Sequence, residues 1–270
     1  MLGRLARCQT CSYVFAPRTP ALLDDVAALY SGSYFTGAEF GDYASQRPTF
    51  ARNFRAYLRR MRRYGATGGR LFEVGCAYGF FLEQAQTSFD AAGIDVNAAA
   101  IDAARAIGLH ASLGEFLDYA AIAPFDVVCM WDTIEHVLEP RGYIEKARAL
   151  LRDGGLLFMT TGDIGSLVAR MRGSHWRQIH PPSHVNYFSR ATIARLLQSS
   201  GFEVLPIRSI GTRRDLLNVL HGLALFSRRP LVRHTAATIE RTGGAWLPPV
   251  GLYINLYDTM FVAARKRPAA

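Results

Sequence analysis

The sequence predicts an α/β protein built on a doubly wound, mostly parallel sheet of seven strands, and three observations support this. Apolar runs of strand length alternate with amphipathic helical runs between residues 70 and 211, as in a parallel sheet covered by helices on both faces. The first apolar run, 71–74, leads into a turn of small residues at 75–79 that opens a helix. A last apolar run, 257–266, is expected to insert antiparallel beside the fifth strand.

Residues 1–64 form the predicted N-terminal extension, with helices at 20–30 and 42–64. In the second helix the apolar residues recur at steps of three and four and therefore share one face. They are Phe50, Phe54, Tyr57, Leu58 and Met61. The opposite face carries Arg52, Arg55, Arg59, Arg60, Arg62 and Arg63. This basic face is either a solvated surface or a contact surface for an anionic partner such as a nucleic acid.

Residues 65–211 form the predicted core, with six of the seven strands. These strands are expected at 71–74, 90–96, 109–113, 125–131, 154–161 and 201–211, and the helices between them at 80–88, 97–107, 140–151 and 189–197. Asn97 and Ser189 begin two of these helices and are the predicted N-caps, because their side-chain oxygens can accept a hydrogen bond from the first turn.

Residues 212–270 form the predicted cap and the last strand. Two helices are expected at 214–226 and 230–242, followed by an apolar stretch at 245–250. A connection of this length between two strands is typical of a functional segment. It caps the acceptor, docks a partner, or rests on a membrane surface with its arginines facing anionic lipid.

The composition indicates an ordinary globular chain. Its 270 residues, half of them hydrophobic, suffice for one α/β domain with extensions. The net charge of +9 arises from 31 basic residues, of which only Lys146 and Lys266 are lysines. We interpret this skew as genome composition rather than as a nucleic-acid task. No signal peptide is recognisable and no apolar run reaches the roughly 20 residues that span a bilayer, so we expect a cytoplasmic protein.

The turn at 75–79 is the predicted cofactor loop. Gly75, Ala77 and Gly79 have almost no side chain, so a ligand can lie on the backbone and meet the N–H groups that open the next helix. A nicotinamide dinucleotide needs a small residue where Phe80 stands, because its diphosphate lies against the helix start. Glu73 places a negative charge nearby. S-Adenosylmethionine carries no phosphate and has a sulfonium and an ammonium, so this acidic residue favours it.

Residues 73–79 resemble the first motif of the class I S-adenosylmethionine-dependent methyltransferases, an acidic residue followed by alternating glycines, with Ala77 at the middle glycine. The resemblance implies a Rossmann-like fold, methyltransferase activity and S-adenosyl-L-methionine as cofactor. Asp95 ends the second strand, where a carboxylate can accept both ribose hydroxyls. The family pattern implies that Glu115 binds the adenine amine and that Asp132 lies at the cofactor's edge. The other interpretation of Glu115 is an acidic residue that is favoured at a helix N-terminus. The other interpretation of the whole motif is a structural turn in another kind of α/β protein.

The stretch after the fourth strand offers a candidate metal site. If it opens a helix, Asp132, Glu135 and His136 share one face, and two carboxylates with an imidazole can hold a hard divalent ion. This stretch resembles the ubiquinone-biosynthesis O-methyltransferases, where a metal role fits the same spacing. The other interpretation is a structural role at the cofactor's edge, and we assign no metal ligands from the sequence.

The loop at 176–189 carries the candidate catalytic residues. Its prolines indicate an extended segment at the carboxyl ends of the strands, beside the cofactor. It resembles the His–aromatic–Phe–Ser pattern of bacterial sugar- and antibiotic-modifying methyltransferases, which implies that His184 is a general base. Ser183 stands where sugar C-methyltransferases have a glutamate, so a hydroxyl or amine acceptor is favoured. Tyr187 and His180 are secondary candidates. A purely structural role for His184 is also open.

Cys8 and Cys11 form a single C-x-x-C pair, half of a tetrahedral zinc site. The pair resembles the second knuckle of the zinc ribbon that precedes many sugar methyltransferases, which implies a remnant of that ribbon. The other interpretation is a short β-hairpin that packs Tyr13 and Phe15.

Together these features predict an S-adenosylmethionine-dependent methyltransferase acting on oxygen or nitrogen of a small molecule, a sugar, glycan or secondary metabolite. The alternatives are a quinone or lipid O-methyltransferase and a non-catalytic binding module that retains the fold. Nucleic acid is not the expected substrate, because the loop after the fourth strand reads Trp131-Asp132-Thr133-Ile134 and lacks the N-P-P-Y type motif of adenine-directed DNA methyltransferases. Peripheral membrane contact and the oligomeric state remain open.

Overall fold

The structure, a computed structural model, describes residues 5–31, 46–215 and 251–268. The strands of its main sheet are β3 (Arg70–Val74), β4 (Asp90–Asp95), β5 (His110–Leu113), β6 (Phe125–Trp131), β7 (Leu151–Gly162), β9 (Phe202–Val204), β10 (Arg208–Ser209) and β13 (Thr259–Lys266). The helices are α1 (Pro20–Ser31), α2 (Arg47–Arg62), α3 (Phe80–Ala85), α4 (Ala98–Ala106), α5 (Pro140–Leu150), α6 (Leu167–Arg172) and α7 (Arg190–Ser199), with short 3₁₀ helices η2 (Phe116–Asp118) and η3 (Gly173–His175).

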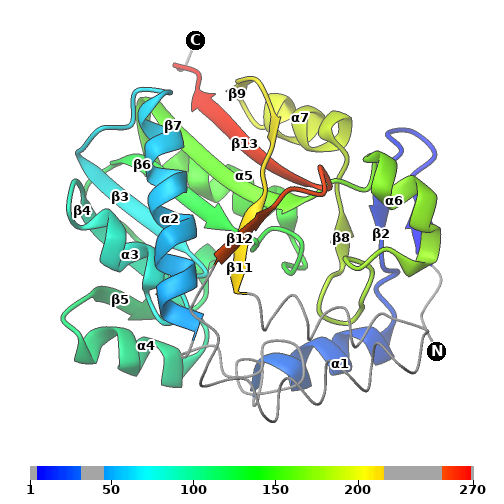
Figure 1. The fold of residues 1–270 in the computed structure, drawn as a ribbon, viewed down its shortest axis with the longest axis horizontal. Coiled ribbons are helices and arrows are strands. Elements are labelled where there is room, and N and C mark those ends of the chain that lie inside the picture. Colours follow the sequence, from blue (N-terminus) through cyan, green and yellow to red (C-terminus); the bar gives the residue numbers. More distant parts are fainter. Residues whose placement is uncertain (1–4, 32–45, 216–250, 269–270) are drawn as a thin grey trace.

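The predicted Rossmann-like α/β fold is confirmed. The main sheet has the order β10-β13-β7-β6-β3-β4-β5, and the five strands from β7 to the edge strand β5 are parallel. The last strand, β13, lies antiparallel to β7, with Val262 opposite Met159. Helices cover both faces of this sheet (Figure 1). Because β4 and β6 lie on opposite sides of β3, the strand order reverses there, and ligands of such sheets bind at this point.

The sixth predicted strand, 201–211, is divided into two. Strands β9 and β10 each pair with β13, and Leu205, Pro206 and Ile207 lie between them. Proline has no N–H group for a sheet ladder, so the continuous strand expected from the apolar pattern is interrupted at Pro206.

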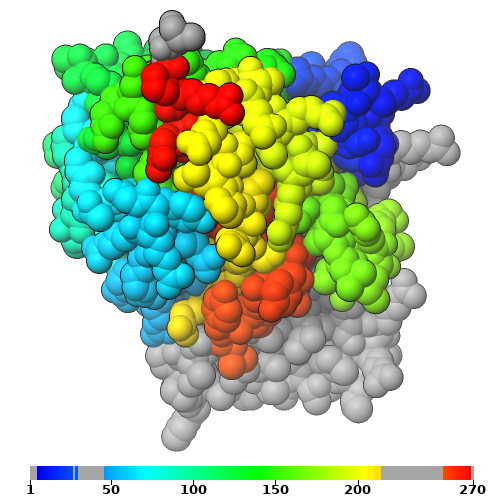
Figure 2. Space-filling model, turned by 90° about the horizontal axis from the view of Figure 1, so that it is seen from above, coloured from blue at the N-terminus to red at the C-terminus, as the bar shows by residue number. Residues whose placement is uncertain are grey.

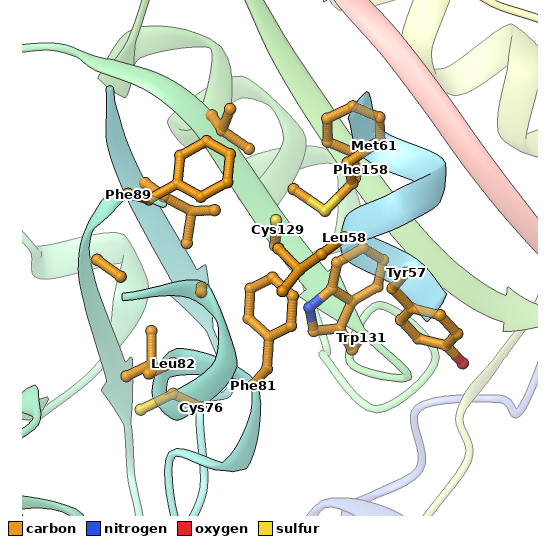
Figure 3. Packing of buried hydrophobic residues seen from close by; sticks show 14 of the residues in the cluster. Tyr57, Leu58, Met61, Cys76, Phe81, Leu82, Phe89, Cys129, Trp131 and Phe158 are labelled. Carbon is orange, nitrogen blue, oxygen red and sulfur yellow. The ribbon is translucent and has the colours of Figure 1, made fainter. Parts of the chain in front are cut away.

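The core has one layer on each face of the sheet. On one face, Tyr57, Leu58 and Met61 of α2 pack against the sheet and α3, so the predicted apolar face of α2 is confirmed (Figure 3). On the other face, α5 and α7 cover β6, β7 and β13. Figure 2 shows α2, in blue to cyan, on the surface of the molecule. Its outward arginines Arg55, Arg59 and Arg62 are exposed.

The N-terminal extension includes the hairpin of β1 (Ala6–Arg7) and β2 (Val14–Phe15), with Cys8 and Cys11 in its turn. The Tyr13 ring lies 5.6 Å from that of Phe15 and 5.3 Å from that of Phe188. The hairpin interpretation is thereby confirmed. Strand β2 also pairs with β8 (Asn186–Tyr187), which lies in the loop at 176–189 that carries His184. The hairpin and this loop therefore form one small sheet. Among the described residues, neither cysteine belongs to a group of three metal-binding side chains.

The predicted helical cap lies mostly outside the described residues, which include none of 216–250. At its ends, β11 (Thr212–Asp215) pairs with β12 (Gly251–Ile254), so residues 214–215 belong to a strand instead of the expected helix. Residues 32–45, including the start of the helix expected at 42–64, are likewise outside the description. Within the described part of the chain, no helix is both long and apolar enough to cross a membrane.

Candidate functional site

The candidate site lies where three neighbouring parallel strands end. Gly75 follows β3, Asp95 ends β4, and Asp132 follows β6. The carboxyl ends of parallel strands meet at one edge of a sheet, and the strand order reverses at β3. The fold therefore brings together three of the residues that the sequence assigned to cofactor binding.

The small-residue turn after β3 offers space instead of hydrogen-bond donors. Gly75, Ala77 and Gly79 all have positive φ, at 74°, 46° and 73°. The Gly75 N–H donates to the Ile94 carbonyl at 2.9 Å, the Gly79 N–H to the Cys76 carbonyl at 2.8 Å, and the Ala77 N–H to Asp95 Oδ2 at 2.8 Å. The turn thus uses these three N–H groups to hold its own shape, and the contact of a ligand with the N–H groups that open α3 stays a prediction.

Replacing Gly75 by alanine tests the need for this space. A Cβ atom there would lie 2.9 Å from Thr133 Oγ1, at a φ of 74° that also disfavours a side chain. Gly108→Ala is a matched control, since Gly108 has φ 81° but nothing within 4 Å of the added Cβ. We expect both variants to lose about 1 kcal/mol of stability from the φ angle, and Gly75→Ala alone to lose S-adenosylhomocysteine affinity in calorimetry. Equal affinities would contradict the crowded-turn account.

Asp95 links the turn to the helix that follows β4. Its Oδ2 accepts from the Ala77 N–H, and its Oδ1 accepts from the Asn97 N–H at 2.9 Å. Burial raises the pKa of this carboxyl, and hydrogen bonds from the backbone of Asn97, Ala77 and Val96 oppose that rise. Asn97 caps α4 through the Ala100 N–H, as predicted. Each Asp95 oxygen retains a lone pair, so a pair of ribose hydroxyls is a suitable ligand.

Glu73 is a buried carboxyl group one residue before the end of β3. It is 3% exposed, and among the described residues its Oε2 has no hydrogen-bond partner. Burial, followed by the Asp95 charge, raises its pKa well above the ordinary value. An unpaired buried carboxylate is costly unless a cation or donor meets it. The site therefore fits a cofactor that brings positive charge, as the sulfonium and ammonium of S-adenosylmethionine do.

Glu115 and Asp95 both act on one tyrosine, Tyr143, which the sequence did not indicate. Tyr143 on α5 has a raised pKa, first from burial and then from the Glu115 and Asp95 carboxylates. Glu115 is exposed, precedes η2, and makes no side-chain capping bond. Its predicted role in adenine binding remains untested. Tyr143 could not be found from the sequence, since no motif links it to Glu115.

The stretch after β6 is a turn, so the condition for a shared helix face, that this stretch opens a helix, is not met. Asp132 takes a positive φ of 48°, and its N–H donates to the Thr160 carbonyl and to Thr160 Oγ1. A positive φ is uncommon outside glycine and often marks a functional site. Asp132, Glu135 and His136 therefore do not share a helix face. In this turn Asp132 is exposed to solvent, whereas Glu135 is buried.

Glu135 and His136 instead meet His184 from the loop after β7. One ligand atom from each of these three residues lies within 4.8 Å of the other two. His136 Nδ1 lies 2.9 Å from the Ser183 carbonyl, and His184 Nδ1 lies 3.0 Å from the Gln178 carbonyl. Because a carbonyl only accepts, each ring carries a proton on Nδ1, so Nε2 is the nitrogen of each ring that can act as a metal ligand. Two imidazoles and a carboxylate form a donor set that divalent transition metals can use.

His184 is a neutral base in this arrangement. It is 8% exposed, and burial, followed by His136 and His180, holds its pKa well below the ordinary value. Its ring centroid lies 3.8 Å from that of His180. The Tyr187 hydroxyl donates to the His184 carbonyl at 2.7 Å, so Tyr187 fixes the backbone beside the histidine. The catalytic roles predicted for His184 and Tyr187 remain predictions.

The loop that carries His184 is anchored at its start by Asp258, which the sequence analysis missed. Asp258 is 1% exposed; its Oδ2 accepts from Trp176 Nε1 at 2.9 Å, and its Oδ1 from Arg177 Nη2 at 2.9 Å. Burial by itself raises the pKa of Asp258, but the hydrogen bonds from Arg177 and Trp176 outweigh it and hold the pKa below the usual value. The partners are more than 80 residues apart in the chain, so no local pattern reveals them.

We expect Asp258→Asn to destabilise the protein by about 2–3 kcal/mol at pH 7, because Arg177 loses its charged partner. A carboxyl with a lowered folded pKa stabilises above its unfolded pKa, and this contribution is lost as pH falls through the folded pKa. The difference between wild type and variant should thus shrink below about pH 4 in thermal unfolding. Asp153→Asn is the control, since Asp153 pairs with Lys266 at 3.5 Å but is 59% exposed. A difference that persists at pH 3 contradicts the ion-pair account.

Comparisons with known proteins show what the chain is similar to. A family model described as a methyltransferase domain matches residues 43–207. A ubiquinone biosynthesis O-methyltransferase of Caulobacter vibrioides is 33% identical over 103 residues, which are 35% of this chain and 41% of that protein. Its counterpart from Paraburkholderia xenovorans is 28% identical over 166 residues, 52% of this chain and 71% of that protein. The chain thus spans only part of these curated relatives.

Two solved structures show the same fold. The magnesium protoporphyrin IX methyltransferase of Synechocystis with bound S-adenosylhomocysteine has a TM-score of 0.56 at 13% identity, and the match covers 90% of this chain and 99% of that one. A S-adenosylmethionine-dependent methyltransferase of Archaeoglobus fulgidus has a TM-score of 0.55 at 16% identity, covering 83% of this chain and 99% of that one. At such identities the likeness extends to the fold alone.

Proposed function

This chain belongs to the methyltransferase domain family, and from that premise we propose that it methylates an oxygen or nitrogen atom of a small molecule beside His184. The family match favours a S-adenosylmethionine-dependent methyltransferase over the non-catalytic alternative. The observation that carries the proposal is the His184 imidazole, whose Nδ1–H is held by the Gln178 carbonyl while Nε2 keeps its lone pair. This nitrogen can take a proton from a hydroxyl or an amine.

When bound, S-adenosylmethionine supplies an electrophilic methyl group on a cationic sulfur. In our proposal Glu73 offsets the positive charge, Asp95 holds the ribose, and Glu115 and Asp132 border the adenine and the methionine. Gly75, Ala77 and Gly79 leave space for the cofactor because they have almost no side chain. The main contribution of the protein is alignment, because holding acceptor and methyl group in line removes much of the barrier.

His184 removes the acceptor proton in this proposal. Its pKa lies well below the ordinary value, because the ring is buried and faces His136 and His180. The ring is therefore neutral at pH 7 and ready to accept a proton, although a lower pKa also makes it a weaker base. Tyr187 acts indirectly, by holding the His184 carbonyl.

The acceptor we propose is a sugar, glycan or secondary metabolite. The loop pattern around His184 supports this, since it resembles that of sugar- and antibiotic-modifying methyltransferases. A quinone precursor or another lipid is the second candidate, favoured by the similarity to ubiquinone biosynthesis O-methyltransferases. Incubation with methyl-labelled cofactor and two acceptor panels, sugars and hydroxylated aromatics, decides between them. Labelling of sugars supports the first candidate, and labelling confined to aromatic hydroxyls replaces it with the second.

Replacing Glu73 by glutamine tests its role toward the cationic cofactor. Because the folded-state pKa of Glu73 is raised, the ligand-free protein loses stability as pH rises from about 4.5 through that folded pKa. Glutamine does not titrate. We therefore expect Glu73→Gln to melt about 2–4 °C above wild type at pH 8 and closer to it at pH 5. Its affinity for S-adenosylhomocysteine, which keeps the ammonium but not the sulfonium, should fall at least about tenfold.

Glu83→Gln, which alters the ion pair of the half-buried Glu83 with the exposed side chain of Arg47 at the protein surface, serves as the control. It should change neither the affinity nor the pH dependence of melting, because surface pairs contribute little. A Glu73→Gln variant that binds S-adenosylhomocysteine as tightly as wild type would show that Glu73 is a structural residue of β3.

A further inference from the structure

The turn after β6 and the loop after β7 are joined by a group of hydrogen bonds that neither segment reveals in its own sequence. They are Asn186 Nδ2 to the Ile134 carbonyl at 2.9 Å, Asn186 Nδ2 to the Val137 carbonyl at 2.7 Å, the Asn186 N–H to the Glu135 carbonyl at 3.0 Å, the Val185 N–H to the same carbonyl at 2.9 Å, and His136 Nδ1 to the Ser183 carbonyl at 2.9 Å. Asn186 makes three of these bonds.

The Asn186 side chain uses every polar group that it has. Its two amide hydrogens go to the Ile134 and Val137 carbonyls, one on each side of Glu135 and His136. Its Oδ1 accepts from the Tyr13 hydroxyl of the N-terminal hairpin. The residue is 4% exposed, so water cannot replace a lost partner without a rearrangement.

These contacts fix how the two histidines face each other. The rings of His136 and His184 have centroids 4.6 Å apart and planes at 85°. His184 lies two residues before Asn186, and His136 lies between the two carbonyls that Asn186 holds. A shift of Asn186 therefore moves both rings together, from two loops that follow different strands.

We propose that Asn186 is a positioning residue for methyl transfer. It holds His184 in a fixed position relative to the turn that carries Glu135 and His136. The proposal rests on the proposed function in one respect, namely that His184 lies beside the acceptor. It also gives the hairpin of β1 and β2 a role, because Tyr13 and the pairing of β2 with β8 hold Asn186 from the other side.

The requirement for an amide at this position follows from its partners. Two carbonyl oxygens face the Asn186 nitrogen, so only a group with two hydrogens satisfies both. Aspartate has the same shape but would direct an oxygen at these two carbonyls. Asn186→Asp therefore removes the hydrogen bonds and preserves the volume, and any effect cannot be ascribed to a cavity.

The experiment compares wild type, Asn186→Asp, Tyr13→Phe and Asn53→Asp. Asn53 is the matched control, because it is also buried and also binds a remote backbone segment, through Arg213 at 3.1 and 2.7 Å, without contacting either loop. Nitrogen-15 spectra of the histidine rings measure the hydrogen-bonded Nδ1–H groups of His136 and His184. Calorimetry measures the affinity for S-adenosylhomocysteine, and single-turnover methyl transfer measures the rate.

In Asn186→Asp we expect the His136 Nδ1–H signal to exchange with water or vanish and the rate to fall about 10- to 100-fold, with cofactor affinity within about threefold of wild type. Tyr13→Phe, which removes one donor from Oδ1, should lower the rate less than about fivefold. Asn53→Asp should leave both the signals and the rate unchanged. Asn186→Ser, which keeps one donor, replaces Asn186→Asp in every arm if the latter does not fold, and it should give a smaller change of the same sign.

An Asn186→Asp protein with wild-type ring signals, or with altered signals and a wild-type rate, overturns the proposal. Loss of rate and cofactor affinity together would also overturn it, because the residue would then support the whole fold. Failure of the proposed function is recognised separately, since His184→Ala would then transfer methyl groups at the wild-type rate while the ring spectra still report on Asn186.

Discussion

His184→Ala should lower the rate of methyl transfer about 100- to 10,000-fold at saturating cofactor and acceptor, the usual contribution of a positioned general base. Its Nε2 lone pair is the proton acceptor in our account, and alanine removes it. Single-turnover rates with methyl-labelled cofactor measure the change. Affinity for S-adenosylhomocysteine should stay near that of wild type, because none of the residues assigned to the cofactor belongs to the loop after β7.

The pH dependence adds a second criterion. Since burial and the neighbouring His136 and His180 lower the pKa of His184, the wild-type rate should fall only when pH drops below that lowered pKa. The acidic limb of the profile should therefore lie below the ordinary histidine value of about 6.5. His110→Ala is the matched control, because His110 is an exposed histidine at the opening of β5. A His184→Ala protein that keeps the wild-type rate across pH 6 to 9 would show that the histidine is structural.

The second large effect is expected at Asp95. Asp95→Ala removes the acceptor for the ribose hydroxyls and also releases the Ala77 and Asn97 N–H groups, so the turn loses its anchor. We expect the dissociation constant of S-adenosylhomocysteine to rise at least about 100-fold, which corresponds to about 2.7 kcal/mol. Calorimetric titration measures it.

Asp90→Ala provides the control on the same strand. Asp90 begins β4, is 75% exposed and pairs weakly with Arg70 at 3.7 Å, so its loss should leave affinity and stability nearly unchanged. An Asp95→Ala variant that binds as tightly as wild type would place the cofactor elsewhere and would contradict the assignment of the strand ends.

The features that the sequence predicted best depend on neighbouring residues. The caps at Asn97 and Ser189 are both present, and Ser189 forms a capping box with Thr192. The strands that end at Gly75 and Asp95 were found because apolar runs and small-residue turns are local signals. Parallel pairing then brought these ends together without any further information.

The errors arose where distant residues decide the backbone. The shared face considered for Asp132, Glu135 and His136 required a helix after β6, but the Ile134 and Val137 carbonyls of that stretch accept hydrogen bonds from Asn186 instead. The strand expected at 201–211 is interrupted at Pro206. The expectation followed the apolar pattern and did not consider that proline lacks the N–H group of a sheet ladder. Likewise, the meeting of Glu135, His136 and His184 depends on loops from two strands, so spacing in the sequence suggested Asp132 in place of His184.

The most direct test of the central claim is where the methyl group goes. Purified protein is incubated with methyl-labelled S-adenosylmethionine and a cell extract that has been separated into small molecules, nucleic acids and proteins. Our account predicts that label enters the small-molecule fraction, at a rate that falls at least about 100-fold with His184→Ala. Label that enters nucleic acid or protein instead, or small-molecule labelling that is unchanged in His184→Ala, would contradict it.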